Sequence, residues 1–352
     1  MNAIAAPAAR PDARARSPNQ RAWARFKRNR IGYVSLWIFL VLLVVATFAE
    51  FISNDRPLVA RYEGHWYFPV FDNPPETTFG GDFRTPTDWT DPLIVEHFRR
   101  PGNWALHTLN PHSANSLDYF QKSPNPAPPD DKRLLGTDEV GRDMLARLIY
   151  GFRVSIWFAL ALTAVGTALG VAMGALQGYF GGRLDLTTQR VIEIWNSIPE
   201  LYLLIIFASI FAPSLLLLLV LLSLWGWIGL SDYVRAEFLR NRNLEFVKAA
   251  RALGLSNWQI VRRHVAPNSM TPVITFLPFR MSGAILALTS LDFLGLGVPP
   301  SVPSLGDLLR QGKNNLDSWW IIVPTFVLLV VTMALLTFIG DALRDAFDTR
   351  KS

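Results

Sequence analysis

Long apolar runs without a charged side chain dominate the pattern of this sequence. Four runs lack Asp, Glu, Lys and Arg, and a fifth contains only Arg280; they span residues 31–49, 154–182, 201–231, 318–340 and 271–291. About 20 apolar residues in a helix cross the roughly 30 Å hydrocarbon core of a bilayer. Because a bilayer forces backbone polar groups to pair within their own segment, these runs predict membrane-spanning helices.

The run at 201–231 fits either one span or two spans broken at Ala212-Pro213-Ser214. The next segment, 232–263, carries seven basic residues against three acidic ones, which is typical of a cytoplasmic loop. With a cytoplasmic N-terminus, only two spans place that segment inside. The first of the pair then begins near Val191 and contains Glu193, Pro199 and Glu200.

The sequence therefore predicts an all-α integral membrane protein with six transmembrane helices and both termini in the cytoplasm. A basic N-terminal arm (1–30) precedes an uncleaved first helix (31–52), because the apolar run is longer than that of a cleaved signal. An external insert (53–150) leads into the membrane domain (151–342), and a cytoplasmic tail (343–352) ends the chain. The five helices expected in the membrane domain are at about 154–180, 191–211, 214–231, 271–291 and 319–340.

Composition supports this class. Hydrophobic residues make up 50% of the chain and charged residues 18%, which is unusual for a water-soluble domain of 352 residues. The net charge of +6 fits orientation in a membrane rather than nucleic acid, since the basic residues cluster beside the apolar runs. There is no cysteine, so neither a disulfide nor a thiolate metal site can form.

A cytoplasmic segment at 243–267 predicts two short helices with a break between them. Apolar residues recur at helical spacing in its first half, at Phe246, Ala249, Ala250 and Leu253. Gly254 follows at the position where a helix end favours a residue that can take positive φ.

The second half of this segment begins with Ser256 and Gln259, which have the spacing of a capping box. Pro267 marks its expected end, just before the next span. An amphipathic helix lying on the membrane surface is the alternative interpretation.

The same segment resembles the Glu-Ala-Ala loop of ABC-importer permeases, which forms a coupling helix that docks into a groove on the ATPase. The chain keeps Ala249, Ala250, Gly254 and Pro267 at the spacing of that motif, and departs from it at Lys248, His264 and Ala266. The resemblance implies an ATPase-coupling role for Phe246, Lys248, Ala249, Ala250, Leu253, Gly254, Leu255 and Pro267. Lys248 in place of Glu removes any ion pair that the family makes with that Glu.

Other motifs resemble the dipeptide and oligopeptide permeases, and specifically their second, C-like subunit. They are Gly136–Asp143, Gly151–Ser155, Arg190 to Pro199, Leu291–Gly297 with Pro303–Gly306, and Gly340–Asp345 with Asp348. Glu193, Asp292 and Leu305 are departures from the family pattern. Asp292, Arg280 and the large insert are most similar to the Yej-type permeases of oligopeptides and microcin C.

This resemblance implies a type I importer permease in the bacterial inner membrane, carrying peptides or peptide-like compounds such as microcin C. The implied partners are a second homologous permease, an ABC ATPase (two subunits or a fused pair), a periplasmic peptide-binding protein and membrane lipid. The chain lacks a phosphate-binding loop, since Gly312-Lys313-Asn314 has neither the upstream glycine nor the hydroxyl residue. It is expected to be no enzyme, with no catalytic residue and no bound cofactor, while the ATPase uses ATP and Mg.

The alternative class is a secondary transporter of peptides or other solutes without an ATPase partner. Such proteins use inverted repeats and paired intramembrane carboxylates, and the sequence indicates neither feature. It would also leave the cytoplasmic segment at 243–267 without a role.

Polar residues within the apolar runs suggest a translocation pathway. Arg280 lies near the middle of its span, where a charge costs about 2.5 kcal/mol or more unless it faces a cavity or a carboxylate. It either lines the pathway and meets a peptide carboxylate, or pairs with Glu193 or Asp292. Ser197 and Pro199 are expected to shape a kink beside the same path.

Small residues predict close helix packing in the second span. Its glycines recur at a spacing of four, at Gly166, Gly170, Gly174 and Gly178. Such a stripe allows another helix to approach closely, either within the chain or at a subunit seam.

The external insert is rich in aromatic residues, so we expect a small folded lobe packed on the membrane domain rather than a disordered linker. The stretch His65–Phe71 predicts a short edge strand because it contains Pro69. The lobe either has a role in transport, by guiding or docking the binding protein or by covering the pathway mouth, or only stabilises the fold. Metal binding is not expected, since His65, His97, His107 and His112 lack helical ligand spacing and no cysteine assists them.

Overall fold

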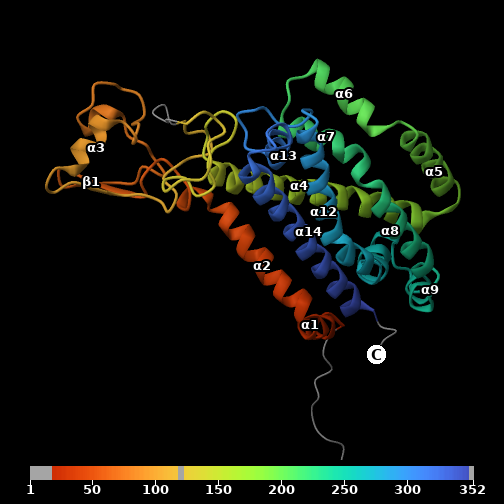
Figure 1. The fold of residues 1–352 in the computed structure, drawn as a ribbon. Helices are drawn as coiled ribbons and strands as arrows, with labels where there is room; N and C mark the ends of the chain where they lie inside the picture. The colour runs from red at the N-terminus through yellow and green to blue at the C-terminus, as the bar shows by residue number, and fades with distance from the viewer. Residues whose placement is uncertain (1–17, 118–122, 349–352) are drawn as a thin grey trace, which may run out of the picture.

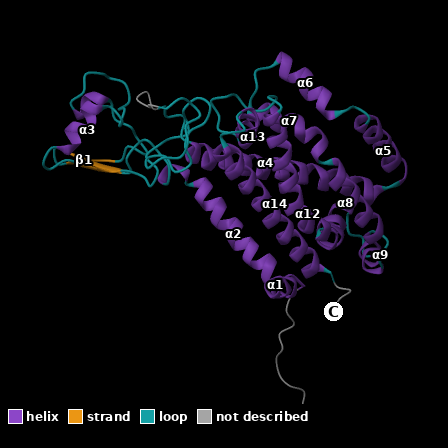
Figure 2. Cartoon of the chain, in the orientation of Figure 1, coloured by secondary structure: helices purple, strands orange, loops and turns teal. Residues whose placement is uncertain are grey.

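A computed structural model describes residues 18–117 and 123–348 of the chain (Figure 1). Residues 1–17 of the expected N-terminal arm and 349–352 of the expected tail lie outside the described residues. The fold is a bundle of long apolar helices with a small lobe of strands and loops on one side (Figure 2).

The membrane part consists of α1 (Pro18–Arg28), α2 (Arg30–Thr47), α4 (Met144–Phe180), α5 (Gly182–Asn196), α6 (Glu200–Ile210), α7 (Leu215–Gly226), α8 (Ile228–Asn241), α9 (Glu245–Ala252), α10 (Asn257–Ile260), a π-helical turn η3 (Val261–Val265), α11 (Ala266–Ser269), α12 (Thr271–Phe293), α13 (Leu305–Asn314) and α14 (Trp319–Phe347). The lobe contains the 3-10 turns η1 (Ala49–Phe51) and η2 (Glu76–Phe79), the strands β1 (Val59–Tyr62), β2 (His65–Tyr67) and β3 (Trp104–Leu106), and the helix α3 (Pro92–Arg99).

Five helices of the described chain are long and apolar enough to cross a membrane: α2, α4, the continuous pair α7–α8, α12 and α14. The pair α5 and α6 qualifies as a sixth span only as a bent unit, because its two halves meet at 64°. The connection between α6 and α7 falls at residues 211–214, where Ser214 caps the start of α7 and the sequence indicated a break.

The two ends of the described chain lie on the same side of the bundle. Phe26 of α1 is buried against Ala342 and Ala346 at the end of α14. The Arg25 guanidinium also donates to the backbone carbonyl of Asp348 at 3.0 Å. Because α1 leads directly into α2, the number of crossings between these ends must be even. The bent pair α5–α6 therefore counts as the sixth crossing.

The single helix expected at about 191–211 is instead two helices, and the kink expected at Ser197 and Pro199 is the break between them. Helix α5 begins at Gly182 and ends at Asn196, and α6 starts only after Pro199. A proline disfavours helical conformation in the residue before it and has no N–H to donate, so the chain turns at 197–199.

Helix α4 begins at Met144 rather than near residue 154, with the Asp143 side chain capping it through the Ala146 N–H. Its 37 residues reach about 55 Å at 1.5 Å per residue, so it extends well beyond the bilayer core. The extra turns contain Arg147 and Arg153, which are paired with acidic groups outside the membrane. Arg147 and Arg153 end the charge-free run in the sequence, but α4 continues through both residues.

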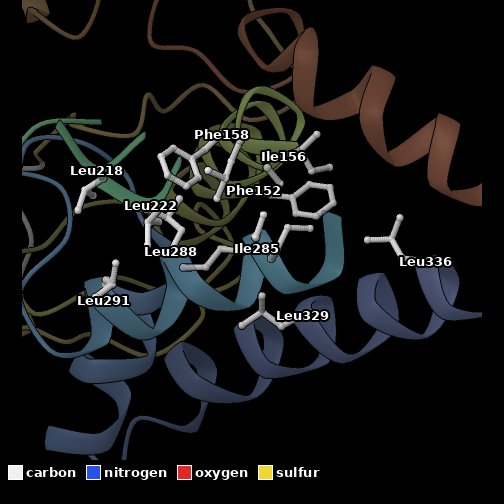
Figure 3. Close-up of a cluster of buried hydrophobic side chains, with 14 of the residues drawn as sticks. Phe152, Ile156, Phe158, Leu218, Leu222, Ile285, Leu288, Leu291, Leu329 and Leu336 are labelled. Carbon is white, nitrogen blue, oxygen red and sulfur yellow. The ribbon is translucent and has the colours of Figure 1, made fainter. Parts of the chain in front are cut away.

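The main core joins the spanning helices of the bundle (Figure 3). Its buried side chains come from α2, α4, α6, α7, α12, α13 and α14, and include Phe152, Ile156, Phe158, Leu218, Leu222, Ile285, Leu288, Leu291, Leu329 and Leu336. These side chains hold the spans together on one side of α4.

The other side of α4 packs on α8 through the glycine stripe. A Cβ added at Gly170, Gly174 or Gly178 would come within 3.0 Å of a backbone carbonyl oxygen of α8 or of the residue that caps it. These oxygens belong to Trp227, Ser231 and Arg235. Gly166 meets the carbonyl of Gly226, at the end of α7, in the same way. The stripe therefore packs within the chain, where it lets two helix backbones approach closely.

The lobe has its own core under a three-stranded antiparallel sheet of order β2-β1-β3. Ala60, Tyr62, Phe79, Trp89 and Ile94 are its buried apolar residues. The edge strand expected at His65–Phe71 is present as β2, although it ends at Tyr67.

The expectation that the lobe packs on the membrane domain holds only for its base. Asn110 donates to Asp143 at 2.7 Å, and the Tyr150 hydroxyl donates to the backbone carbonyl of Ser53 at 2.9 Å. The strands and α3 lie to the side of the bundle, beyond the outer end of α2 (Figure 1). Because Tyr62 and Phe79 are buried within the lobe's own core, the lobe does not need the bundle to cover them.

Replacing Gly174 with Ala should lower the stability of the chain by about 1–3 kcal/mol, because the new methyl group would collide with the Ser231 carbonyl of α8. Gly229→Ala, on α8 itself, is the matched control, since nothing lies within 4 Å of an added Cβ there. Thermal unfolding of the two purified variants in detergent measures the difference. Equal melting temperatures would contradict close α4–α8 packing.

Candidate functional site

The cytoplasmic segment between α8 and α12 folds as two helical parts around a tight turn. Helix α9 ends at Ala252, and Gly254 follows with φ of +80°, in the left-handed region that glycine takes without strain. The Leu255 N–H then reaches back to the Ala250 carbonyl at 3.2 Å. Ser256 and Gln259 make the reciprocal hydrogen bonds of a capping box at the start of α10, as their spacing predicted.

The end of the segment differs from the sequence prediction. The helix does not stop at Pro267 but continues through the π-helical turn η3 and α11 to Ser269. Pro267 stands at the start of α11, where a missing N–H is tolerated. Pro267 has no backbone N–H to donate within this turn. The Asn268 side chain supplies a donor there, to the His264 carbonyl at 2.7 Å.

Helix α9 has two faces with different surroundings. Val247 and Ala250 are buried against α8 and the later turns of the segment. Phe246, Ala249 and Leu253 are exposed, with Leu253 80% accessible. The four apolar residues expected on one face therefore separate: Ala250 turns inward with Val247, and the other three form an open apolar surface. We call Phe246, Ala249 and Leu253 the outward face of α9.

Lys248 also points into solvent and forms an exposed ion pair with Glu245 at 2.8 Å. The pair lies within one turn of α9, so its contribution to stability is small. The substitution of Lys for the family's Glu therefore changes the charge of the helix surface without changing how α9 is held.

Buried contacts tie the segment to the cytoplasmic ends of α4 and α8. Asn241 at the end of α8 donates to Ser269 at 2.8 Å, and both side chains are buried. The Tyr179 hydroxyl of α4 donates to Asn257 at 2.8 Å. Arg242 donates to the carbonyls of Gly178 and Tyr179. A force on the outward face of α9 would therefore reach two spans through rigid contacts.

An intramembrane cavity of about 270 Å³ lies between α4, α6, α7 and α12. Its lining is Leu162, Thr163, Glu200, Leu222, Trp225, Gly226, Arg280, Gly283, Ala284 and Ala287. The Arg280 guanidinium reaches into it from α12 and donates to the Gly226 carbonyl at 2.7 Å. The sequence thus indicated one residue of the cavity, and three further polar ones, Thr163, Glu200 and Trp225, come from other helices.

Several polar atoms around this cavity have no hydrogen-bond partner within the described part of the chain. They are buried atoms: Nε of Arg280, Nε1 of Trp225 and Oγ1 of Thr163. Burying such donors without a partner costs about 1–3 kcal/mol each. The three residues line the cavity, but these unpaired atoms themselves are covered by neighbouring atoms, so a small movement of the helices is needed before they can meet a carboxylate or carbonyl oxygen; Glu200 adds an acceptor suited to an amine.

Neither structural partner expected for Arg280 lies beside it. Glu193 pairs with Arg190 on the exposed side of α5 at 2.5 Å. Asp292 is buried and accepts hydrogen bonds from the Ser304 hydroxyl and, at 2.8 Å, from the Val298 N–H. It thus fixes the loop between α12 and α13 rather than neutralising a charge in the span.

Ser197 and Pro199 occupy the bend between α5 and α6. The Ser197 hydroxyl donates to the Ile194 carbonyl at 2.6 Å and closes the last turn of α5. Pro199 precedes Glu200, the first residue of α6 and part of the cavity lining. The two residues therefore act on the cavity by setting the direction of α6.

The motif Gly136–Asp143 forms a clamp outside the membrane that pattern reasoning did not find. Arg147 is completely buried and lies 3.8 Å from Asp138 and 3.5 Å from Asp307 of α13. Arg142 pairs with Asp138 at 2.7 Å, and Trp320 of α14 donates to the Thr137 carbonyl at 3.2 Å. The clamp joins the outer ends of three helices.

Asp307 also pairs with Arg310 on the outer surface of α13 at 2.5 Å. This hydrogen bond raises the pKa of the Arg310 guanidinium above its usual value, so Arg310 keeps its charge. The only sequence signal for the whole network is the cluster of Asp and Arg just before α4.

Comparison with known families places these features in context. Residues 148–352 match the family of binding-protein-dependent transport system inner membrane components. Residues 17–69 match the N-terminal transmembrane domain of oligopeptide transport permease C. The first match contains α5 to α14, including the cytoplasmic segment and the cavity.

Individual relatives extend over nearly the whole chain. The inner membrane ABC transporter permease protein YejE of Escherichia coli (strain K12) is 46% identical over 95% of this chain and 98% of its own length. The peptidoglycan transport system permease protein YejE of Agrobacterium fabrum is 46% identical, with 95% and 93% covered. The dipeptide transport system permease protein DppC of Lactococcus lactis subsp. cremoris is 31% identical, with 95% and 91% covered.

The division of α9 into two faces predicts different effects of two truncations. Val247→Ala should destabilise the chain by about 1–3 kcal/mol, because it leaves a void among buried side chains. Leu253→Ala should leave stability unchanged, because Leu253 makes few contacts to lose. Thermal unfolding in detergent measures both, and an equal loss of stability would mean that the outward face is packed within the chain.

Proposed function

The chain belongs to the family of binding-protein-dependent transport system inner membrane components, and from this premise we propose that it is the permease subunit of an ATP-driven importer of peptides. The observation that carries the proposal is the outward face of α9, an apolar surface on a helix anchored to two membrane spans. Exposed apolar residues on a cytoplasmic helix fit a protein partner.

We propose that this partner is an ABC ATPase, either two subunits or one fused pair, which binds the ATP and Mg. A second homologous permease completes the membrane pathway, and a periplasmic peptide-binding protein delivers the substrate from outside. The multi-pass chain then lies in the bacterial inner membrane, among its lipids, with α1 and α9 in the cytoplasm. The basic residues of α1 and of the segment after α8 support this orientation.

In this mechanism, closure of the ATPase moves α9 through its outward face. Val247 and Ala250 pass the movement to α8, and the hydrogen bonds from Tyr179 and Arg242 pass it to α4. Helices α4 and α8 move as one body because their backbones are in close contact along the glycine stripe. The bend between α5 and α6 is the part of the membrane domain that can change its angle with least loss of packing.

The cavity around Arg280 is our candidate for the translocation pathway. It lies between spans that move with α9, and Arg280, Thr163 and Trp225 line it. A peptide carboxylate or carbonyl would satisfy those donors as it passes. Ser197, Pro199 and Glu200 would act on the same path through the direction of α6.

The substrates that we propose are oligopeptides and peptide-like compounds. The names of the relatives refer to dipeptides and to peptidoglycan, so the proposal includes peptide fragments of the cell wall. We also propose microcin C, on the resemblance of the sequence to Yej-type permeases. A secondary transporter finds no support, because it would give the outward face of α9 no role.

The first test is co-purification of the tagged chain with the ATPase from solubilised membranes. Leu253→Glu should abolish co-purification of the ATPase, because a buried unpaired carboxylate opposes docking. Leu316→Glu is the matched control, since Leu316 is 78% exposed in the connection between α13 and α14 on the other side of the membrane. The control should retain the ATPase. If Leu253→Glu retains it equally well, α9 is not the docking helix.

A second test addresses the cavity. Arg280→Leu should reduce uptake of a labelled tripeptide into membrane vesicles by about tenfold or more, which corresponds to loss of a charged hydrogen bond. Co-purification with the ATPase should be unchanged, because Arg280 is remote from α9, and Arg280→Lys should restore part of the uptake. Normal uptake by Arg280→Leu, with normal assembly, would remove Arg280 from the pathway.

A further inference from the structure

The sheet of the lobe has one buried face and one open face. Ala60, Tyr62 and Ala105 point into the lobe core. Their neighbours along the strands point the other way, because side chains alternate across a sheet. Arg61 pairs in register with Trp66 of β2 and Trp104 of β3, and Val59 pairs with Leu106. We call Arg61, Trp66, Trp104 and Leu106 the aromatic face of the sheet.

The aromatic face is exposed and apolar, where an antiparallel sheet normally presents polar residues to water. Trp66 is 57% exposed, and Trp104 and Leu106 are also exposed. The two indole rings meet edge to face at a centroid distance of 5.5 Å, and the Arg61 guanidinium lies 5.8 Å from the Trp66 ring. The cluster is therefore ordered by its own contacts, yet it has no cover within the described chain.

A line of exposed aromatic rings connects the lobe to the end of a membrane span. Phe48 and Phe51, at the outer end of α2, lie 6.1 Å apart, and Phe71 of the lobe lies 5.8 Å from Phe51. All three rings are exposed. The exposed aromatic surface at the outer end of α2 thus continues onto the lobe as far as Phe71.

The orientation of the lobe places α3 and the aromatic face on opposite sides of the sheet. The sheet lies to the side of the bundle, beyond the outer end of α2, and α3 lies on the side of the sheet away from α1 (Figure 1). Because α3 and η2 cover the buried face, the aromatic face turns towards the side on which α1 lies, which is also the side of the apolar helices.

We propose that the aromatic face of the sheet rests on the outer leaflet of the membrane and anchors the lobe there. Tryptophan is the residue type most favoured at the boundary between headgroups and acyl chains, because its ring is apolar and its N–H is polar. Leu106 enters the apolar layer beside the two rings. Arg61, between them, is placed to contact lipid phosphate, which guanidinium binds with good geometry.

The absence of cysteine from the sequence makes this inference testable with single spin labels. Leu106→Cys places a label on the aromatic face, and Leu93→Cys places one on α3, at a leucine of comparable exposure on the opposite side of the lobe. Each full-length variant is labelled and reconstituted in nanodiscs of phosphatidylethanolamine and phosphatidylglycerol. Accessibility to oxygen and to a water-soluble nickel chelate is then measured by electron paramagnetic resonance.

We expect the ratio of oxygen to nickel accessibility to be several-fold higher at residue 106 than at residue 93, because oxygen concentrates in lipid. Equal, water-like ratios at both positions would overturn the proposal. Low accessibility of residue 106 to both reagents would also overturn it, since that result means that protein covers the face. Ala60→Cys, at a fully buried position, should resist maleimide in the same nanodiscs and so verify that the lobe is folded.

Discussion

The close approach of α4 and α8 is the contact on which the rest of the membrane domain depends. Four glycines along α4 remove every side chain that would hold the two backbones apart. The stripe starts at Gly166, whose added Cβ would meet both Gly226 and the Arg280 guanidinium of the cavity. It ends at Gly178, whose carbonyl accepts a hydrogen bond from Arg242. Arg242 is the residue just before the cytoplasmic segment. About 18 Å of rigid helix pair, at 1.5 Å per residue, therefore joins the cavity to the cytoplasmic segment.

Two buried arginines, Arg147 and Arg280, have different kinds of partner. Arg147 is fully buried outside the membrane, where two carboxylates lie within 4 Å and the clamp holds three helix ends. Arg280 is placed within the membrane with a backbone carbonyl as its partner and one nitrogen left without any in the described chain. The first arrangement is that of a structural ion pair. The second leaves hydrogen-bonding capacity of a charged group beside a cavity, which is unusual for a purely structural charge in a membrane.

The lobe outside the membrane is attached to the bundle by few contacts. Its base is joined to α4 by buried hydrogen bonds, and its core needs no residue of the bundle. The sheet is left free to present one face beside the outer end of α2. An anchored lobe would stay in one place while the spans move, and would keep that side of the pathway mouth open to a delivered substrate.

The sequence by itself determined the elements that rest on local chemistry. Charge-free runs identified the spans, basic residues indicated their orientation, and the capping box and Gly254 located the turn in the cytoplasmic segment. Tertiary structure decided what depends on distant neighbours: that Ala250 turns inward while Leu253 stays exposed, that Asp292 fixes a loop, and that Thr163, Glu200 and Trp225 join Arg280. It also extended α4 past its charged residues, because partners far along the chain neutralise them. A one-dimensional pattern records which residues are apolar or charged, and their partners are fixed only when the helices pack.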